Sequence, residues 1–379
     1  MTARASDGPG RGSDAPTRTP WTREGVVAIL AVLGLALAAR LIIAYAFPGT
    51  GLKFDLDSFH AWAANLAHDG LYGVYDRDFF LDYTPGYLYV LYLVGLAGQA
   101  MGGIGDLIKI PPILADVVIG WLVWSMALEL GASRRAAVIG AVIVVVNPVS
   151  WLDSVTWGQV DSFGVVFLLL GLRELWRDHP ERAAIFAVIA ALIKPQLAIL
   201  VPIVAAVTIR RALWPEDPER AEAAALPAGA GLRQRLLAWE RRTGHPIRIL
   251  TTGLAGLAMT LILSAPVGLS VLEIGPNGLR SGLLEQIFST ASGYPYVSVN
   301  AYNPWALAEV NGNGIAASGS WICDAVIANP VSGGPVCGEA FLIFGTIPAV
   351  ALGAALLAFA FAVVCGIVAI RVYPAGDMS

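Results

Sequence analysis

The sequence predicts an all-α polytopic membrane protein, and its composition and the length of its apolar runs both favour this class. The chain is 56% hydrophobic and only 14% charged, with a mean hydropathy of +0.67, whereas about one quarter of a soluble domain is charged. Several apolar runs approach or exceed the roughly 18 residues that cross a bilayer. They lack the alternation typical of strands, and a helix satisfies its own backbone hydrogen bonds in lipid. We therefore expect a helix bundle.

The apolar runs divide the chain into four parts. Residues 1–24 are rich in Gly, Pro, Ser, Thr and Arg, a composition that predicts a disordered cytoplasmic tail. A transmembrane module is expected over 25–268, an external loop over 269–340, and a last helix with a cytoplasmic tail over 341–379. The eight predicted spans are 25–47, 111–130, 136–150, 161–175, 183–193, 196–209, 248–268 and 341–370.

The arginines orient these spans, because loops rich in Arg and Lys stay in the cytoplasm. Arginines gather in the N-terminal tail, in the turn 132–135, in 173–182 and in 210–248. These loops share one side only if a ninth apolar run, 83–103, does not cross the membrane. We expect this run to lie along the outer surface or to re-enter it. Its tyrosines suit an interface, and they are Tyr83, Tyr87, Tyr89 and Tyr92. An ordinary span that breaks the charge rule once is the alternative.

The stretch "KFDLDSFHAWAANLAHDG" is unusually rich in ionisable residues for so apolar a chain. Its apolar residues have helical spacing, which predicts a short amphipathic helix over 58–69 at the outer surface. Asp57 or Ser58 can cap that helix, whereas Asp55 precedes it and is not needed as a cap. Asp55 is therefore the stronger candidate for a functional carboxylate and Asp57 the weaker. The alternative for both is a solvated loop carboxylate.

The stretch "WLDSVTWGQVDSF" forms a second external cluster. Asp161 stands where the fourth span begins, and Gln159 lies two residues before it. A carboxylate at the mouth of a helix bundle points to function, because ionisable groups at that depth are seldom incidental. Trp157 could stack on a sugar or anchor the membrane interface.

Basic residues on the expected outer side provide the third clue. Lys109 begins the second span, and Lys194 lies between two half-length apolar runs, which suggests a broken or tilted hairpin. Arg40 lies inside the first span and requires an anionic partner there. Together they predict cations at the depth of the lipid phosphates. Side chains that snorkel from helix ends are the alternative.

Cys323 and Cys337 share the expected external loop. That loop would face an oxidising compartment, so we predict a disulfide between them. A zinc site is not expected, because no Cys-x-x-Cys motif or nearby histidine completes four ligands.

Four segments, in order, resemble the GT-C superfamily of membrane glycosyltransferases that use polyprenyl-phosphate sugars. They are "FDLDSFHAWAANLAHDGLY", "DYTPGYLYVLY", "NPVSWLDSVTWGQVDS" with "LIKPQL", and "SVNAYNPWAL". The likeness covers roughly 25–310 and is closest to bacterial relatives of the eukaryotic second mannosyltransferase of GPI-anchor assembly. Members usually carry more spans after the shared module than this chain does.

The resemblance implies a large first external loop with juxtamembrane helices and an acidic catalytic base in that loop. Asp55 matches the base and Asp161 a second external carboxylate. A basic residue near Lys194 would contact the carrier phosphate, and we add Lys109 and Arg40 as candidates. The sugar or acceptor would contact Gln159, Trp157, Asn300, Tyr302 and Asn303.

The expected reaction is transfer of a hexose, with mannose implied, from a polyprenyl phosphate to a glycan or lipid acceptor on the external face of the cell membrane. Asp55 would take the proton of the acceptor hydroxyl, and the cations would stabilise the departing phosphate. One displacement inverts the anomeric centre. No nucleic-acid partner is expected. Whether Mg²⁺ or Mn²⁺ bridges Asp and phosphate stays open, and a lipid or lipid-linked sugar flippase or a non-catalytic assembly subunit are the competing classes.

Overall fold

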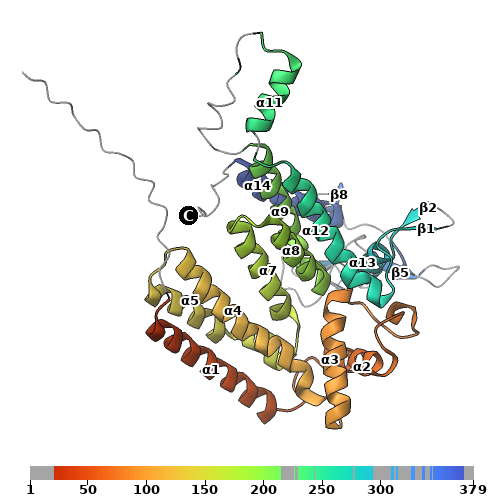
Figure 1. Ribbon diagram of the computed structural model, residues 1–379. Helices are drawn as coiled ribbons and strands as arrows, with labels where there is room; N and C mark the ends of the chain where they lie inside the picture. The colour runs from red at the N-terminus through yellow and green to blue at the C-terminus, as the bar shows by residue number, and fades with distance from the viewer. Residues whose placement is uncertain are drawn as a thin grey trace, which may run out of the picture.

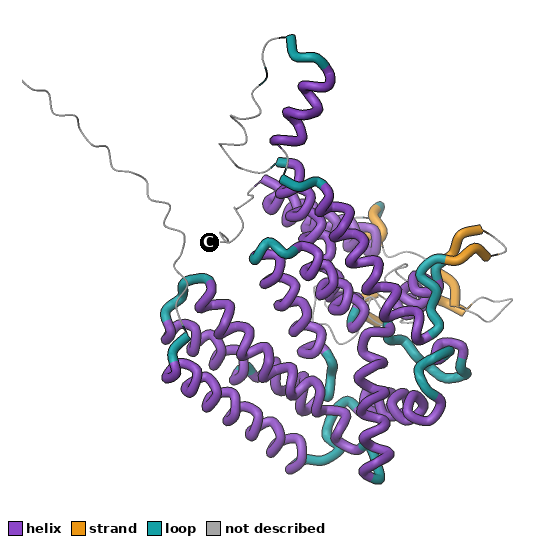
Figure 2. Tube along the Cα trace, in the orientation of Figure 1, coloured by secondary structure: helices purple, strands orange, loops and turns teal. Residues whose placement is uncertain are grey.

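A computed structural model represents the protein and describes most of the chain. The described residues are 21–214, 226, 229–242, 244–275, 278–292, 309–310, 313–314, 326–328, 335–337, 342–343 and 345–370. The described part is mostly helical, and short strands occur only toward its C-terminal end (Figures 1 and 2).

Every predicted span corresponds to a helix. In chain order these helices are α1 (Arg23–Ala46), α4 (Ile110–Glu129), α5 (Arg134–Val146), α7 (Asp161–Trp176), α8 (Pro180–Ile193), α9 (Leu200–Leu213), α12 (Ile247–Ser264) and α14 (Ala349–Ile370). Four described helical stretches are long and apolar enough to cross a membrane: Arg23–Ala46, Gly105–Glu129, Pro195–Leu213 and Ile247–Val267. Arg134–Val146 and Pro148–Trp157 add a fifth if this pair, bent by 43°, is one span. The chain thus has the character of an all-α membrane protein.

The expected external loop and the first residues of the predicted last span contain strands that the sequence did not predict. They form two-stranded antiparallel sheets: β1 (Glu273–Gly275) with β2 (Gly278–Arg280), β3 (Glu309–Val310) with β4 (Asn313–Gly314), β5 (Val326–Ala328) with β6 (Pro335–Cys337), and β7 (Leu342–Ile343) with β8 (Ile347–Pro348). Helix α13 (Gly282–Ser292) follows β2. These sheets are too small to change the helical class.

The segment between α1 and α4 leaves and returns at one end of the bundle. The Gly49 N–H group donates to the carboxylate of Asp106 at 3.3 Å, and Lys109 Nζ donates to the carbonyl oxygen of Thr50 at 2.7 Å. The helices of this segment, α2 (Lys53–Asp69) and α3 (Pro85–Met101), gather with α13 at that end of the bundle (Figure 1). We call it the pocket end.

Helix α2 begins earlier than the sequence predicts. It starts at Lys53, with Leu52 as an N-cap that makes no side-chain hydrogen bond. The Leu56 N–H group already donates to the Leu52 carbonyl at 3.1 Å. The expectations that Asp57 or Ser58 caps this helix and that Asp55 precedes it are therefore wrong. Asp55 lies in the first turn, where the helix dipole favours a carboxylate.

Helix α3 packs tightly because glycines line two of its contacts. A β-carbon at Gly95 would lie 2.0 Å from the carbonyl oxygen of Ala63 in α2, and one at Gly86 would lie 2.6 Å from the backbone of Leu192 in α8. Tyr87 of α3 is 1% exposed inside the same core. The expected interfacial position is wrong for Tyr87, because its ring packs against Phe59, Tyr83 and Phe163.

Helices α8 and α9 form the hairpin that the sequence suggested around Lys194. Lys194 has an extended backbone (φ −148°, ψ 119°), and a 3₁₀ turn, η4 (Pro195–Ile199), leads into α9. Arg211, in the last turn of α9, donates to the carbonyl oxygen of Leu175 at the end of α7, 2.7 Å away. This contact holds the open end of the hairpin beside the end of α7. Lys194, at the tip of the hairpin, therefore lies at the opposite end, which is the pocket end.

Candidate functional site

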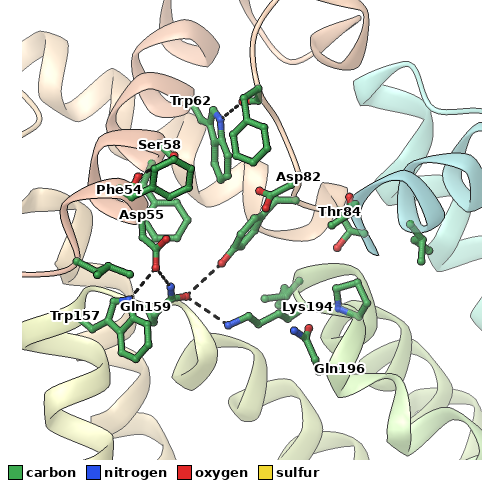
Figure 3. A pocket seen from close by; sticks show the side chains of 18 residues that line it. Phe54, Asp55, Ser58, Trp62, Asp82, Thr84, Trp157, Gln159, Lys194 and Gln196 are labelled. Atoms are coloured by element: carbon green, nitrogen blue, oxygen red, sulfur yellow. Dashed lines mark hydrogen bonds between the residues drawn. The ribbon is translucent and has the colours of Figure 1, made fainter. Parts of the chain in front are cut away.

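A cavity of about 570 Å³ opens at the pocket end (Figure 3). Its walls combine aromatic, carboxylate, amide and ammonium side chains from segments distant in the sequence. The lining residues that carry chemistry are Asp55, Asp82, Tyr83, Thr84, Trp157, Gln159 and Lys194, and the aromatic lining residues include Phe54, Trp62 and Phe80. Such a mainly apolar cleft with a few convergent polar groups is the usual form of a small-molecule site.

The carboxylate of Asp55 is held at the cavity wall through one of its oxygens. Trp157 Nε1 donates to Asp55 Oδ2 at 2.8 Å, and Gln159 Nε2 donates to the same oxygen. Within the part of the chain that the structure describes, no hydrogen bond to Oδ1 is found. Hydrogen bonds to Oδ2 thus orient the carboxylate. Oδ1 can accept a hydrogen bond from a hydroxyl group, or its proton.

Gln159 also connects Asp55 to a cation. Its Oε1 lies 3.4 Å from Lys194 Nζ and 3.4 Å from the Tyr83 hydroxyl, and both groups donate to it. Lys194 Nζ is also 2.7 Å from Asp161 Oδ1. A carboxylate and an ammonium therefore lie on opposite sides of a single amide, which Figure 3 shows. A base and a cation therefore face the same cavity.

An irregular helix positions the two residues that hold Asp55. The π-helical turn η3 (Leu152–Trp157) ends at Gly158, whose φ of 83° lies in the left-handed region that favours glycine. The Gly158 N–H group donates to the carbonyl oxygen of Asp153 at 2.9 Å and closes the turn. Trp157 and Gln159 flank this turn, and α7 begins two residues later at Asp161.

Arg40 lies away from the cavity, in a buried ion pair. Its Nε is 2.8 Å from Asp116 Oδ2 of α4, and the two side chains are 3% and 2% exposed. Asp116 also accepts hydrogen bonds from Ser154 at 2.7 Å and from Ser162. The sequence correctly required an anionic partner for Arg40, but a role for Arg40 in binding donor phosphate does not fit, because the pair is closed to solvent.

Lys109 does not fit its expected role in phosphate binding either. Its side chain is 0% exposed and lies 3.0 Å from Asp106 Oδ1, while its Nζ also donates to Thr50. Its charge is satisfied where the segment between α1 and α4 meets α4. Asp57 is exposed on α2 and does not line the cavity. Lys194 is therefore the predicted phosphate-binding residue that the structure brings to the cavity.

Most of the remaining predicted residues lie outside the part of the chain that the structure describes. Asn300, Tyr302 and Asn303 lie outside the described residues, and so does Cys323. The backbone of Cys337 ends strand β6, and the predicted disulfide stays a prediction. Among the described residues no three His, Cys, Asp or Glu side chains form a group that could hold a metal ion. Whether Mg²⁺ or Mn²⁺ bridges an aspartate and the donor phosphate therefore stays open.

Sequence reasoning missed Asp82, Tyr83 and Asp116. Asp82 directly precedes the run 83–103, and Tyr83 begins this run, which the sequence places at the outer surface of the membrane. Instead Tyr83 packs on Phe59 and Trp62. Burial, and then the nearby charge of Asp161, raises the pKa of the Tyr83 phenol well above its ordinary value. The phenol therefore keeps its proton and donates to Gln159. Asp116 stands as a carboxylate inside the apolar run 111–130. Its position there was the signal in the sequence that could have identified it as the partner of Arg40.

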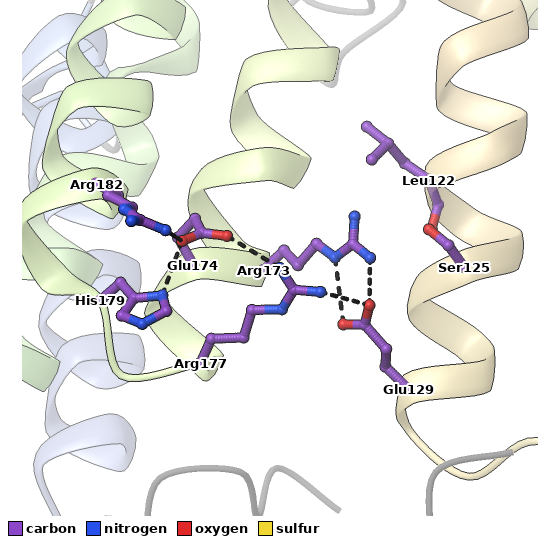
Figure 4. Close-up of polar contacts among 8 residues, drawn as sticks. All are labelled: Leu122, Ser125, Glu129, Arg173, Glu174, Arg177, His179 and Arg182. Carbon is purple, nitrogen blue, oxygen red and sulfur yellow. Dashed lines mark hydrogen bonds and ion pairs between the residues drawn. The ribbon is translucent and has the colours of Figure 1, made fainter. Parts of the chain in front are cut away.

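A second charged cluster lies at the C-terminal ends of α4 and α7, away from the pocket end (Figure 4). We call this end of the bundle the arginine end. Glu129 of α4 pairs with Arg173 and with Arg177, the latter at 2.6 Å. Glu174 pairs with Arg177 at 3.3 Å, with His179 at 2.9 Å and with Arg182 at 3.4 Å. Each carboxylate is shared between two arginines, and Glu174 also contacts His179, which ties α4, α7 and α8 together.

No family model, curated protein or solved structure matches this chain. The functional argument therefore rests on the residues of the cavity.

Proposed function

We propose that the protein is an integral membrane glycosyltransferase that transfers a hexose, with mannose expected, from a polyprenyl phosphate to a hydroxyl of a lipid or glycan acceptor. The observation that carries the proposal is the placement of Asp55 and Lys194 around Gln159 at the cavity wall. A glycosyl transfer from a lipid phosphate needs one base for the acceptor and one cation for the leaving group. The cavity offers the ammonium of Lys194 and, besides Asp82, the carboxylate of Asp55 that Trp157 and Gln159 orient.

Asp55 acts as the base in this proposal. Trp157 and Gln159 fix its Oδ2, so that the acceptor hydroxyl gives its proton to Oδ1 as its oxygen attacks the anomeric carbon. The bond from the anomeric carbon to the phosphate oxygen breaks on the opposite face of the sugar, and the configuration inverts. No general acid is needed, because a phosphate monoester is already a good leaving group.

Lys194 supports departure of the phosphate. It pairs with Asp161, and a carrier phosphate would share or replace that partner. A charge-assisted contact of this kind contributes about 1.5–3 kcal/mol. Tyr83 stays protonated and donates a hydrogen bond to Oε1 of Gln159. It thereby orients the Gln159 amide between Asp55 and Lys194.

The proposed topology places the pocket end outside and the arginine end in the cytoplasm. Support comes from the segment between α1 and α4, which leaves and returns at one end through the contacts of Gly49 and Lys109. If 83–103 lies along the outer surface or re-enters it, and the chain crosses eight times, all arginine-rich loops share the other side. Cysteine labelling at Tyr83 and Gly103 tests this topology, because both positions should react from outside. Reaction of Gly103 from the cytoplasm alone would overturn it.

The decisive experiment is transfer by the purified protein in a bilayer. Radiolabelled polyprenyl-phosphate mannose and a panel of lipid and glycan acceptors should yield a labelled product with inverted configuration. Sequestration or translocation of the donor without any product would instead indicate a flippase. Neither binding nor product with any polyprenyl-phosphate hexose would favour an assembly subunit.

A further inference from the structure

A short basic helix stands apart from the bundle beside the ends of α9 and α12 (Figure 1). This helix, α11 (Leu232–Arg242), has the sequence LRQRLLAWERR. Leu232 and Leu236 are 76% and 58% exposed. Residues four apart lie on one face of a helix, so these leucines form an apolar stripe. An exposed apolar stripe is unfavourable in water and indicates that something covers it.

Basic residues border the stripe on both sides. At 100° per residue, Arg233 follows the stripe by about one quarter turn and Arg235 precedes it by a similar angle. Both side chains are exposed. An apolar stripe flanked by arginines is the pattern of a helix that lies in the headgroup region of a membrane. A protein partner of ordinary composition would not require the paired basic flanks.

The position of α11 in the chain keeps it at a membrane boundary. It lies between the apolar stretches Pro195–Leu213 and Ile247–Val267, which are each long enough to span. The Gly244 N–H group donates to the carbonyl oxygen of Ala212 at 2.7 Å, so the chain returns to the end of α9 directly after α11. Trp214, the residue after α9, is 60% exposed, as suits an interfacial anchor.

The charge around α11 identifies the kind of surface. Arginines outnumber acidic residues eight to five over 210–248. Arg134, Arg135 and Arg182 are exposed at the same end of the bundle. Each basic side chain near an anionic leaflet adds about 1 kcal/mol of attraction, whereas a zwitterionic leaflet offers little.

We propose that α11 is an interfacial helix that binds the anionic headgroups of the leaflet at the arginine end. Leu232 and Leu236 enter the acyl boundary, and Arg233 and Arg235 pair with lipid phosphates. The proposal is independent of the glycosyltransferase reaction, because no residue of α11 lines the cavity. It requires only that α9 and α12 span the membrane.

Hydrogen exchange on the full chain in nanodiscs tests this proposal. The amides of 232–238 should exchange more slowly in discs of phosphatidylcholine with phosphatidylglycerol than in discs of phosphatidylcholine alone. Replacement of both arginines, Arg233→Gln with Arg235→Gln, should abolish most of that difference, at about fivefold per side chain. Leu232→Ser with Leu236→Ser should speed exchange in both kinds of disc.

A matched control has the same charge change at the same end. Arg134→Gln with Arg135→Gln removes two exposed arginines from α5 and should leave the exchange of α11 in anionic discs within about twofold of the native value, because these charges lie on another helix. Equal exchange of α11 in both kinds of disc would overturn the proposal. Slow exchange that also persists in detergent would overturn it in favour of a protein partner, such as a second copy of the chain.

Discussion

The pocket end and the arginine end both gather charges, but they use them differently. At the arginine end Glu129 is shared between two arginines, and Glu174 among two arginines and a histidine. At the pocket end Asp55 is held by neutral donors through one oxygen and lines a cavity of about 570 Å³. Charges that saturate one another hold helices together, whereas a charge oriented by neutral groups beside open space can act on a ligand.

The largest expected effect is that of Asp55→Asn on transfer. The carboxamide is nearly isosteric and preserves the fold, but it cannot take a proton from the acceptor. Turnover at saturating donor should fall by a factor of about 10² to 10⁴, with donor affinity nearly unchanged. Asp57→Asn, on the exposed face of the same helix, is the matched control and should stay near normal. Normal turnover of Asp55→Asn would show that Asp55 is not the base.

The next largest effect should be that of Asp116→Asn on stability. The change leaves the guanidinium of Arg40 buried without its counter-ion, and loss of one partner from a buried pair costs about 3–5 kcal/mol. Thermal unfolding in detergent should show a clearly lower Tm. Replacement of both partners, Arg40→Met with Asp116→Leu, should recover part of the loss. A single variant as stable as the native protein would contradict a structural role for this pair.

Lys194→Ala should weaken donor binding about ten- to a hundredfold, since a hydrogen bond to a charged group contributes about 1.5–3 kcal/mol. Departure of the phosphate should slow as well. Titration with polyprenyl-phosphate sugar measures the affinity and single-turnover transfer measures the rate. Lys53→Ala, at the start of α2, serves as the control for loss of one exposed lysine. Equal donor affinity in Lys194→Ala and the native protein would remove Lys194 from the phosphate site.

Glu129→Gln tests whether the charges of the arginine end serve stability and not transfer. Arg173 and Arg177 lose their shared carboxylate but remain partly exposed to water, so the expected loss is only about 1–3 kcal/mol of stability. Transfer per folded molecule should be unchanged. The free energy of unfolding and the specific activity of the folded fraction check both statements. A specific loss of transfer at normal stability would mean that the two ends are functionally coupled.

The smallest effect should be that of Tyr83→Phe, which removes one neutral hydrogen bond and slows transfer by no more than about tenfold. Burial raises the pKa of Tyr83, so its phenol stays protonated in the folded protein as the pH passes the ordinary tyrosine value of about 10. The unfolded chain ionises there, so Tyr83 makes stability fall as the pH rises above that value. The native protein should lose stability more steeply than Tyr83→Phe over this range, and parallel curves would contradict the raised pKa.

The sequence by itself determined the helical membrane class and the positions of the helices. Apolar runs of sufficient length report helices in lipid whatever their neighbours are, and each of the eight predicted runs contains one. It also singled out Asp55, Gln159 and Lys194, which line the cavity. The reason for Asp55, that it precedes the helix, was wrong, because Asp55 lies in the first turn of α2. The isolated Arg40 likewise required an acidic partner.

Only the tertiary structure decided which charges face the cavity. Arg40 and Lys109 resembled phosphate-binding cations in the sequence, but pairing with Asp116 and Asp106 uses their charge internally. Tyr83 and Tyr87 resembled interfacial residues. Instead Tyr83 packs on Phe59 and Trp62, and Tyr87 is buried where α3 approaches α2 and α8 closely. Such contacts join residues far apart in the chain, and a pattern of hydrophobicity along one segment carries no information about the side chains that another segment brings to it.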